Sequence, residues 1–384
     1  MPQTLLKAYR DNAQTPIEEA LCLPFDVYHD ETIHQLEIQQ IFQNDWVFAC
    51  AADKLKSPGD YFAFDLAGEQ VVLLRSKSND LLALSNICRH RGTPLLDLGF
   101  GQLQKNIVCP YHAWTYADNG ELLGVPFEGN CKLAKEQHSL PHFQLHEWRG
   151  LLFVNLSSQA QSFAHKVAKI DPFLEKFELE RFQHSYQTTT EHWQSNWKLA
   201  VENAIESYHL FKVHKETLEK VTPTKSAYYV AGDAHSSLSG GEMKGAQSTL
   251  SKWFSGSNDE AYNQYLLVFL PPSFIAIISY EGFDWIHILP QGNQQCSVTP
   301  GGLSKSPAKN FKSAEFQFSD AFMLEDKVLC ERLQRGMLST KSQGGKLVDM
   351  EKIIVDFHQY LGHKLFDTSV SDYCETQKAA IFLK

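Results

Sequence analysis

The sequence CRHRGTPLLDLGFGQLQKNIVCPYH, residues 88–112, begins and ends with a closely spaced cysteine and histidine. Cys88 and His90 form the first pair, and Cys109 and His112 form the second, with eighteen residues between the pairs. Thiolate and imidazole groups are side chains that bind zinc and iron–sulfur centres. Each pair lies where apolar, strand-like sequence gives way to a loop. We therefore expect two neighbouring loops that hold one metal centre.

Two kinds of metal centre fit these loops. A structural zinc site with two cysteines and two histidines usually begins with a Cys-x(2–4)-Cys pair, which this chain lacks. A Rieske [2Fe–2S] centre needs two cysteines on one iron and two histidines on the other. Because cysteine and histidine alternate, each loop can serve both irons. The pattern favours a Rieske cluster, and a structural zinc site is the alternative.

Residues 46–157 read as a small all-β domain around the two loops. Short apolar runs alternate with turn-forming stretches at 67–69 and 77–80, as strands alternate with tight turns. Trp114 and Tyr116 are expected to pack around the loops. The apolar runs cover residues 61–66, 71–74, 81–84 and 151–156.

The rest of the chain reads as a mixture of helices and strands. Residues 1–45 show helical spacing of apolar side chains, and we expect this segment to pack with a larger domain formed by residues 158–384. The fold class is therefore α+β, with the small all-β domain inserted into the larger one. The expected helices are 191–217, 314–337 and 349–361, and the expected strands are 228–230, 265–270, 274–280 and 285–289.

A second group of ligand-type side chains lies in the sequence ENAIESYHLFKVH, residues 202–214. On a helix, Glu202, Glu206 and His209 would share one apolar face. Carboxylates on such a face are costly unless they are paired or bound to a metal. His214 would point away from His209 on an ideal helix. Both histidines can bind one metal only if the helix ends or bends between them.

Two histidines need a carboxylate to complete the facial triad that holds non-haem iron(II). Glu325 and Asp326 are candidates, because they flank the centre of an apolar helical stripe at nearly equal angles. Periodicity does not choose between them, and a solvated acidic pair is the alternative. The stripe consists of Phe318, Phe322, Leu329 and Leu333.

Together these motifs resemble the catalytic α subunit of Rieske-type non-haem iron oxygenases, the ring-hydroxylating oxygenase family. The resemblance covers most of the chain. It rests on the two Cys/His pairs, on Asn-Trp-Lys at 196–198 followed by Glu-Asn-x-x-Glu-x-Tyr-His-x4-His at 202–214, and on Glu-Asp-x4-Glu-x-x-Gln-x-Gly at 325–336. It implies that the larger domain is catalytic and has an antiparallel sheet curved around a long helix.

The resemblance also implies a role for each candidate ligand. The two cysteines would bind the buried iron of the cluster, and the two histidines of the same loops would bind the outer iron. A separate mononuclear iron would be held by His209, His214 and a carboxylate, for which the family pattern favours Asp326 over Glu325.

Residues next to the iron ligands receive roles by the same resemblance. Glu206 occupies the position of an acidic residue that bridges a cluster histidine and an iron-ligand histidine, and Asn203 occupies a weaker second position near the iron. In this family the cluster of one subunit faces the iron of its neighbour. The usual assembly is a homotrimer or a multiple of it.

The composition excludes several classes of protein. The 384 residues carry a formal net charge of −10, which argues against a nucleic-acid binder and against attraction to an anionic membrane surface. The most apolar stretch, residues 265–280, is too short to span a bilayer, and the first residues lack the apolar core of a secretory signal. The eight scattered cysteines suggest reduced thiols or metal ligands, so we expect a cytoplasmic protein.

The implied reaction is an oxidation that uses O2 and two electrons from NAD(P)H. The chain contains no Gly-x-Gly-x-x-Gly dinucleotide fingerprint, so a separate flavin or iron–sulfur reductase is expected to deliver the electrons. The product would be a mono- or dioxygenated small organic molecule.

The substrate class rests on the bridging position. Many family members that dihydroxylate aromatic rings carry aspartate there, whereas Glu206 resembles members that act on quaternary ammonium compounds such as glycine betaine and carnitine. Such a cation favours aromatic faces. Oxidation of an aromatic ring is the alternative reaction, and a non-catalytic Rieske electron-transfer protein is the alternative from another class. The aromatic candidates are Trp253, Phe254, Tyr262, Tyr265, Tyr280, Phe283 and Trp285.

Overall fold

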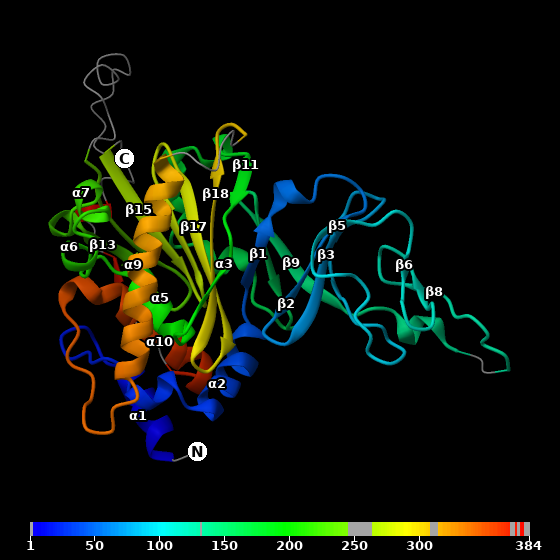
Figure 1. Cartoon of the computed structure of the whole chain (residues 1–384), viewed down its shortest axis with the longest axis horizontal. Coiled ribbons are helices and arrows are strands. Elements are labelled where there is room, and N and C mark those ends of the chain that lie inside the picture. Colours follow the sequence, from blue (N-terminus) through cyan, green and yellow to red (C-terminus); the bar gives the residue numbers. More distant parts are fainter. Residues whose placement is uncertain are drawn as a thin grey trace. The chain divides into compact units, whose positions relative to one another are not determined.

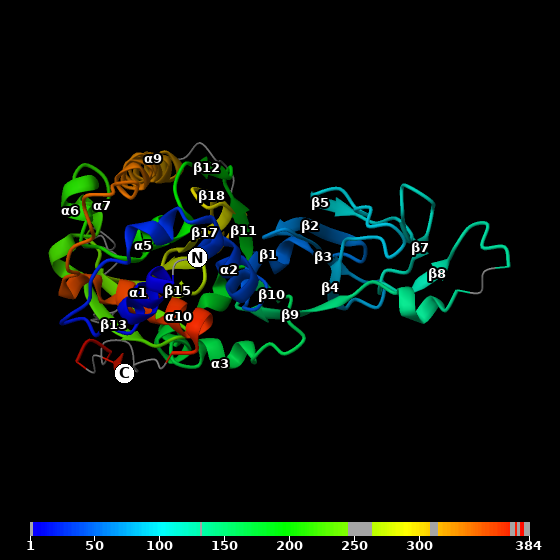
Figure 2. The same cartoon turned by 90° about the horizontal axis from the view of Figure 1, so that it is seen from below.

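The computed structural model describes residues 3–130, 133–244, 263–307, 314–368, 373–374 and 377–379. The chain forms two compact units (Figures 1 and 2). The smaller unit is Phe42–Gln161, and the larger unit combines Met1–Ile41 with Ser162–Lys384. The chain thus enters the larger unit, leaves it to build the smaller one, and returns. Among the described residues, no helix has both the length and the apolar character needed to cross a membrane.

The smaller unit is built from antiparallel strands. One sheet has the order β1-β10-β9-β4-β3-β2-β5, and a small second sheet has the order β6-β7-β8. The four apolar runs expected to be strands are confirmed as β2, β3, β4 and β10. The strands are β1 Val47–Ala51, β2 Asp60–Leu66, β3 Glu69–Arg75, β4 Leu81–Ser85, β5 Gly99–Gln102, β6 Ile107–Val108, β7 Thr115–Tyr116, β8 Leu122–Gly124, β9 His142–Trp148 and β10 Leu151–Asn155.

The larger unit contains one antiparallel sheet with the order β11-β18-β17-β16-β15-β14-β13-β19, in which β12 also pairs with β18. All four strands expected in this region are confirmed, as β13, β15, β16 and β17. The strands are β11 His184–Gln187, β12 Glu191–Trp193, β13 Tyr228–Gly232, β14 Ser237–Glu242, β15 Gln264–Leu270, β16 Phe274–Ile278, β17 Phe283–Gly292, β18 Gln295–Ser304 and β19 Tyr373–Cys374.

Two strands of this sheet, β14 and β18, carry little apolar sequence, so hydrophobic patterns do not predict them. In β18, glycines serve close packing rather than turns. A Cβ atom on Gly301 would lie 2.6 Å from the ring of Trp285 on the neighbouring strand. A Cβ atom on Gly302 would meet the hydroxyl of Tyr186. The missing side chains therefore leave room for aromatic groups on both faces of the sheet.

One face of the sheet is covered by helices. α5 packs against β16, β17 and β18 and lies between α9 and α10 (Figure 2). Phe357 of α10 contacts both Phe269 of the sheet and Trp197 of α5. The helices are α1 Gln3–Ala13, α2 Glu31–Glu37, α3 Phe163–Val167, α4 Asp171–Leu174, α5 Trp197–Ile205, α6 Leu210–Val213, α7 Leu218–Val221, α9 Ala314–Gly336 and α10 Lys352–Phe366.

The expected apolar stripe on α9 is partly wrong. Leu333 is 37% exposed, and the side chain of Phe318 lies outside the described residues. Two of the residues that α9 buries, Asp326 and Gln334, are polar. Hydrophobic periodicity therefore predicted a face of the helix next to the one that is buried. Gln334 accepts a hydrogen bond from the backbone N–H of Asn196, which fixes the C-terminal part of the helix against α5. The buried face consists of Met323, Asp326, Cys330 and Gln334.

A fully buried ion pair joins α5 to α2. The ammonium of Lys198 lies 2.8 Å from the carboxylate of Glu37, and both side chains are 0% exposed. Glu37 also accepts hydrogen bonds from Trp197 Nε1 and the Tyr9 hydroxyl.

Lys198→Met should lower the free energy of unfolding by about 3–5 kcal/mol, because a buried carboxylate loses its cation. Urea unfolding measures the free energy of unfolding of each variant. Lys220→Met is the control, because Lys220 forms an exposed ion pair with Glu216 and its loss should change the free energy of unfolding little.

Candidate metal centres

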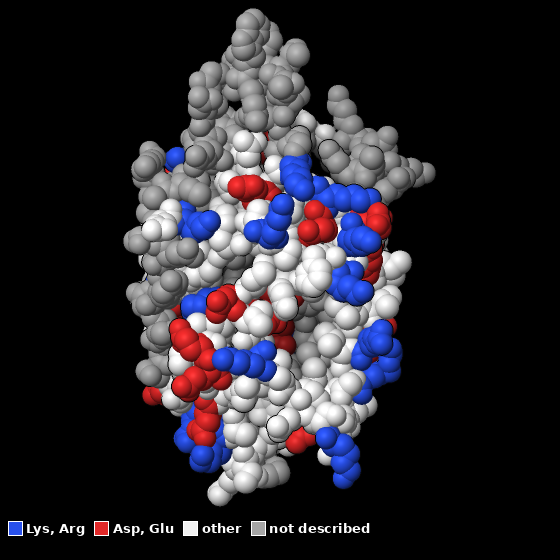
Figure 3. Space-filling model, turned by 90° about the vertical axis from the view of Figure 1, so that its left-hand side faces the viewer, with Lys and Arg blue, Asp and Glu red and all other residues white. Residues whose placement is uncertain are grey.

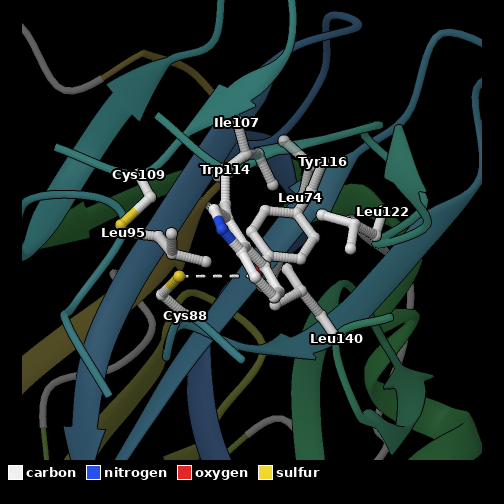
Figure 4. Close-up of a cluster of buried hydrophobic side chains, with 9 residues drawn as sticks. All are labelled: Leu74, Cys88, Leu95, Ile107, Cys109, Trp114, Tyr116, Leu122 and Leu140. Atoms are coloured by element: carbon white, nitrogen blue, oxygen red, sulfur yellow. Dashed lines mark hydrogen bonds between the residues drawn. The ribbon is translucent and has the colours of Figure 1, made fainter. Parts of the chain in front are cut away.

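The two Cys/His loops meet in the core of the smaller unit. The sulfur atoms of Cys88 and Cys109 lie on the same side of the Trp114 ring (Figure 4). Each loop is a tight turn closed by backbone hydrogen bonds: the N–H of Gly92 donates to Cys88 O, and that of Ala113 donates to Cys109 O, both at 3.0 Å. The expected packing of Trp114 and Tyr116 around the loops is confirmed. The surrounding core consists of Leu74, Leu95, Ile107, Trp114, Tyr116, Leu122 and Leu140.

The cysteines and histidines of these loops differ in burial. Cys88 and Cys109 are buried, whereas His90 and His112 are exposed, with ring centroids 4.6 Å apart. His90 also stacks on Trp114. Thiols on the inside and imidazoles at the surface fit a two-iron cluster whose outer iron faces solvent. The donor set therefore suits the [2Fe–2S] centre that the sequence predicts.

Hydrogen-bond donors surround the two sulfurs. Burial alone would raise the pKa of the Cys109 thiol, but the backbone N–H groups of Tyr111 and His112 lower this pKa overall. The Tyr116 hydroxyl lies 3.4 Å from Cys88 Sγ. Because this hydroxyl already accepts a hydrogen bond from the N–H of Arg89, its own hydrogen is available for the sulfur. Burial still raises the pKa of the Cys88 thiol, although the Tyr116 hydroxyl acts in the opposite direction. The contacts around Cys109 therefore favour the thiolate, which is the form that binds iron.

Tyr116→Phe should lower the reduction potential of the cluster. The variant removes a hydrogen bond to a ligand sulfur, and such bonds stabilise the more negative, reduced cluster. A redox titration followed by visible absorption measures the change. Tyr111→Phe is the matched control, because its exposed hydroxyl contacts Arg91 and no sulfur is among its described contacts. Equal potentials in wild type and Tyr116→Phe would contradict the role of the hydroxyl.

In the larger unit, the two candidate iron histidines flank a short helical turn, α6, which follows a break in the helical segment. The expectation of one helix over 191–217 is wrong: α5 ends at Ile205, and Glu206 has extended backbone angles. The Glu206 carboxylate accepts hydrogen bonds from the backbone N–H groups of Tyr208 and His209. This side chain competes with the helical hydrogen bonds and starts a new turn, α6. His209 precedes α6 and His214 follows it.

Three ligand atoms lie close together, two from the histidines at the ends of α6 and one from α9. His209 Nε2 and His214 Nε2 lie 3.6 and 2.9 Å from Oδ1 of Asp326, which extends from α9. One ligand atom from each residue lies within 4.8 Å of those of the other two. Among the described residues, His214 Nε2 and Asp326 Oδ1 are buried without a hydrogen-bond partner. Two imidazole nitrogens and one carboxylate oxygen fit the facial triad of an iron(II) site.

The opposite nitrogen of each imidazole contacts a different carboxylate. His209 Nδ1 contacts Glu206, and His214 Nδ1 lies 2.7 Å from Oε2 of Glu325. An ionised carboxylate only accepts hydrogen bonds, so in its neutral form each imidazole carries its hydrogen on Nδ1 and presents a lone pair at Nε2. Glu325 therefore faces the rear of His214, and the geometry favours Asp326 as the third ligand.

The electrostatics of this group favour a cation. Burial alone would lower the pKa of His209, but the carboxylates of Asp326 and Glu206 raise it to about 10. The pKa of His214 is also raised, because Asp326 and Glu325 outweigh its burial. Asp326 in turn has a lowered pKa, because the two imidazoles outweigh its burial. A divalent cation between these ligands would balance the excess of negative charge.

A recess borders the site. It has a volume of about 210 Å³, and the residues that line it include Glu206, Asp349, Tyr228 and Tyr229. Figure 3 shows acidic side chains at the bottom of a hollow on the face seen there. Glu206 borders the recess and also contacts His209 Nδ1, so it links the recess to the candidate iron site. Sequence patterns gave no signal for this recess, because its walls come from distant segments.

The other candidates fall in different places. Asn203 is buried in the last turn of α5. Trp253, Phe254 and Tyr262 lie outside the described residues. By strand register, Phe283 and Trp285 point to the face of the sheet opposite Phe269 and therefore away from the helices that carry the iron ligands. Tyr280 packs on Phe177, whereas the Tyr265 hydroxyl approaches Ser207 beside Glu206.

Two family models match the chain. The Rieske [2Fe-2S] domain matches residues 45–144, and the catalytic domain of the ring hydroxylating alpha subunit matches residues 179–365. Together they cover both candidate metal centres. The chain belongs to the Rieske-type non-haem iron oxygenases, with the domain pair of their catalytic α subunits.

The chain is also similar to individual proteins of this family. The chain is 28% identical to the glycine betaine monooxygenase oxygenase subunit of Pseudomonas aeruginosa (strain UCBPP-PA14), over 53% of this chain and 47% of that one. The chain thus spans about half the length of this relative. It is 26% identical to the carnitine monooxygenase oxygenase subunit of Escherichia coli (strain K12), over 91% and 95% of the two chains. A solved quaternary ammonium Rieske monooxygenase has the same fold, with a TM-score of 0.80 at 21% identity over 92% and 98%.

Proposed function

We propose that the chain is the terminal oxygenase component of an enzyme system that receives electrons from a separate NAD(P)H-dependent reductase. One observation carries the proposal: His209, His214 and Asp326 converge on a common point in a chain that also holds two Cys/His loops. When bound, iron(II) on such a triad leaves positions open for O2, and a Rieske cluster supplies single electrons. A Rieske ferredoxin without catalytic activity would have no use for the triad.

The residues of the smaller unit would hold and orient the cluster. Cys88 and Cys109 are the proposed ligands of the inner iron, and His90 and His112 those of the outer iron. Their difference in burial supports this division. The exposed imidazoles would form the surface through which electrons leave the cluster.

Glu206 is the proposed contact between two subunits. Its carboxylate holds His209 through Nδ1 and borders a recess. An exposed cluster histidine of a second copy can donate a hydrogen bond to a carboxylate in this place. A homotrimer, or a multiple of it, would close such contacts around a ring. A cytoplasmic location remains a prediction that agrees with the free thiols of the described cysteines.

The proposed substrate is a small quaternary ammonium compound with an N-methyl group. Glutamate at position 206 supports this class, and so do the activities of the two relatives, which are glycine betaine and carnitine monooxygenases. Oxidation of the methyl group would consume O2, two electrons and two protons, and would release formaldehyde, water and the demethylated amine.

A single turnover tests the substrate class. Chemically reduced protein would be exposed to O2 with a panel of glycine betaine, carnitine and aromatic acids, and the products would be identified by mass spectrometry. We expect formaldehyde and a demethylated amine. A hydroxylated aromatic acid would overturn the N-methyl proposal and leave the oxygenase intact. Oxygen consumption without any oxidised organic product from a broadened panel would contradict the oxygenase itself.

A further inference from the structure

Glu325 lies beside the proposed iron site without joining its ligands. Its Oε2 lies 2.7 Å from His214 Nδ1 and accepts a hydrogen bond, also 2.7 Å long, from the hydroxyl of Thr217. Glu325 is the residue that precedes Asp326 on α9, and Thr217 immediately precedes α7. Two neighbouring residues of one helix thus contact opposite nitrogens of the same imidazole.

We propose that Glu325 is a positioning residue that fixes the tautomer and orientation of His214, and that Thr217 in turn fixes Glu325. This inference rests on the proposed iron site. A carboxylate on Nδ1 keeps the hydrogen there, leaves the lone pair on Nε2 and makes the imidazole a stronger donor to a cation. The Thr217 hydroxyl holds the accepting oxygen in place, because it occupies a second acceptor position of that oxygen.

The two histidines of the site are therefore held in different ways. His209 is held by Glu206, which borders the recess. His214 is held by Glu325, which is tied to Thr217 instead. The two carboxylates therefore have separate roles in the proposed site. Glu206 links His209 to the cluster histidine of a second copy that is proposed to contact it. Glu325 holds His214 in the orientation needed for tight metal binding.

The test compares iron binding in variants of these residues. The mononuclear site would be emptied with a chelator, the cluster kept intact, and Fe(II) titrated back without oxygen. We expect Glu325→Ala to weaken Fe(II) binding roughly 10- to 100-fold. Glu325→Gln should rescue part of the loss, because its amide oxygen still accepts from Nδ1 but carries no charge. Thr217→Val should weaken binding by a smaller factor. Glu331→Gln, on the same helix, is the matched control, because its described contact is to the backbone of Gln194.

A second readout separates positioning from a general loss of structure. Co(II) in the same site has visible absorption bands that follow ligand geometry. These bands should change in Glu325→Ala and in Thr217→Val, whereas the melting temperature and the cluster spectrum should stay close to wild type. If Glu325→Ala does not fold, Glu325→Gln and Thr217→Val carry the same test.

The outcomes distinguish this inference from the function on which it rests. Loss of iron from Asp326→Ala together with wild-type affinity and Co(II) bands in the Glu325 and Thr217 variants would overturn the role of Glu325 alone. Wild-type iron affinity in Asp326→Ala would overturn the metal site and the role of Glu325 with it. Weaker binding in the Glu325 variants, with unchanged Glu331→Gln, supports the proposal.

Discussion

Glu206→Gln should lower product formation by roughly 10- to 100-fold or more while both metal centres remain loaded. The variant keeps the size of the side chain and removes its charge. The neutral amide would hold His209 less firmly through Nδ1, and it would offer a weaker acceptor to an imidazole that enters the recess. The measurement is the rate at which a reduced cluster is reoxidised by O2 in the presence of substrate, followed by visible absorption.

Two comparisons make the Glu206 prediction specific. Glu216→Gln removes a nearby glutamate that is exposed and paired with Lys220, and it should leave the reoxidation rate unchanged. Glu325→Gln, in contrast to Glu206→Gln, should lower the iron content of the protein. Full product formation by Glu206→Gln, with both metals present, would show that this residue does not bridge the centres.

Asp326→Ala should abolish product formation, because it removes the only carboxylate oxygen of the proposed triad. The two imidazoles alone bind iron(II) too weakly to retain it during purification. The cluster should be unaffected, since its ligands belong to the other compact unit. The measurements are the iron content of the purified variant and product formation in a single turnover.

Asp320→Ala is the matched control for Asp326→Ala. Asp320 lies on the same helix, α9, but its side chain is exposed. This variant should keep wild-type iron content and activity. Retention of the mononuclear iron by Asp326→Ala would mean that another group completes the site, and the assignment of the third ligand would be wrong.

Local patterns predicted the smaller unit well. The ligands of each loop lie two or three residues apart, so a single turn is enough to bring them together. The apolar runs that became β2, β3, β4 and β10 are separated by turn-forming residues, which mark strand ends directly. Burial of the cysteines and exposure of the histidines required the structure, because it depends on packing around Trp114 and Tyr116.

The iron site was harder to predict because it depends on a broken helix. Helical spacing placed Glu206 and His209 on a common face, but the Glu206 carboxylate forms hydrogen bonds with the next backbone N–H groups and ends the helix. His209 and His214 both follow this break, and the helical turn between them, α6, ends at Val213. The choice between Glu325 and Asp326 likewise needed the position of α9, because the two residues contact opposite nitrogens of His214.

The most direct test of the whole account is the metal and sulfide content of the wild-type protein purified without oxygen. The account predicts about three iron atoms and about two acid-labile sulfides per chain, from one Rieske cluster and one mononuclear iron. One zinc ion and no sulfide would contradict both metal centres, and with them the proposed oxygenase.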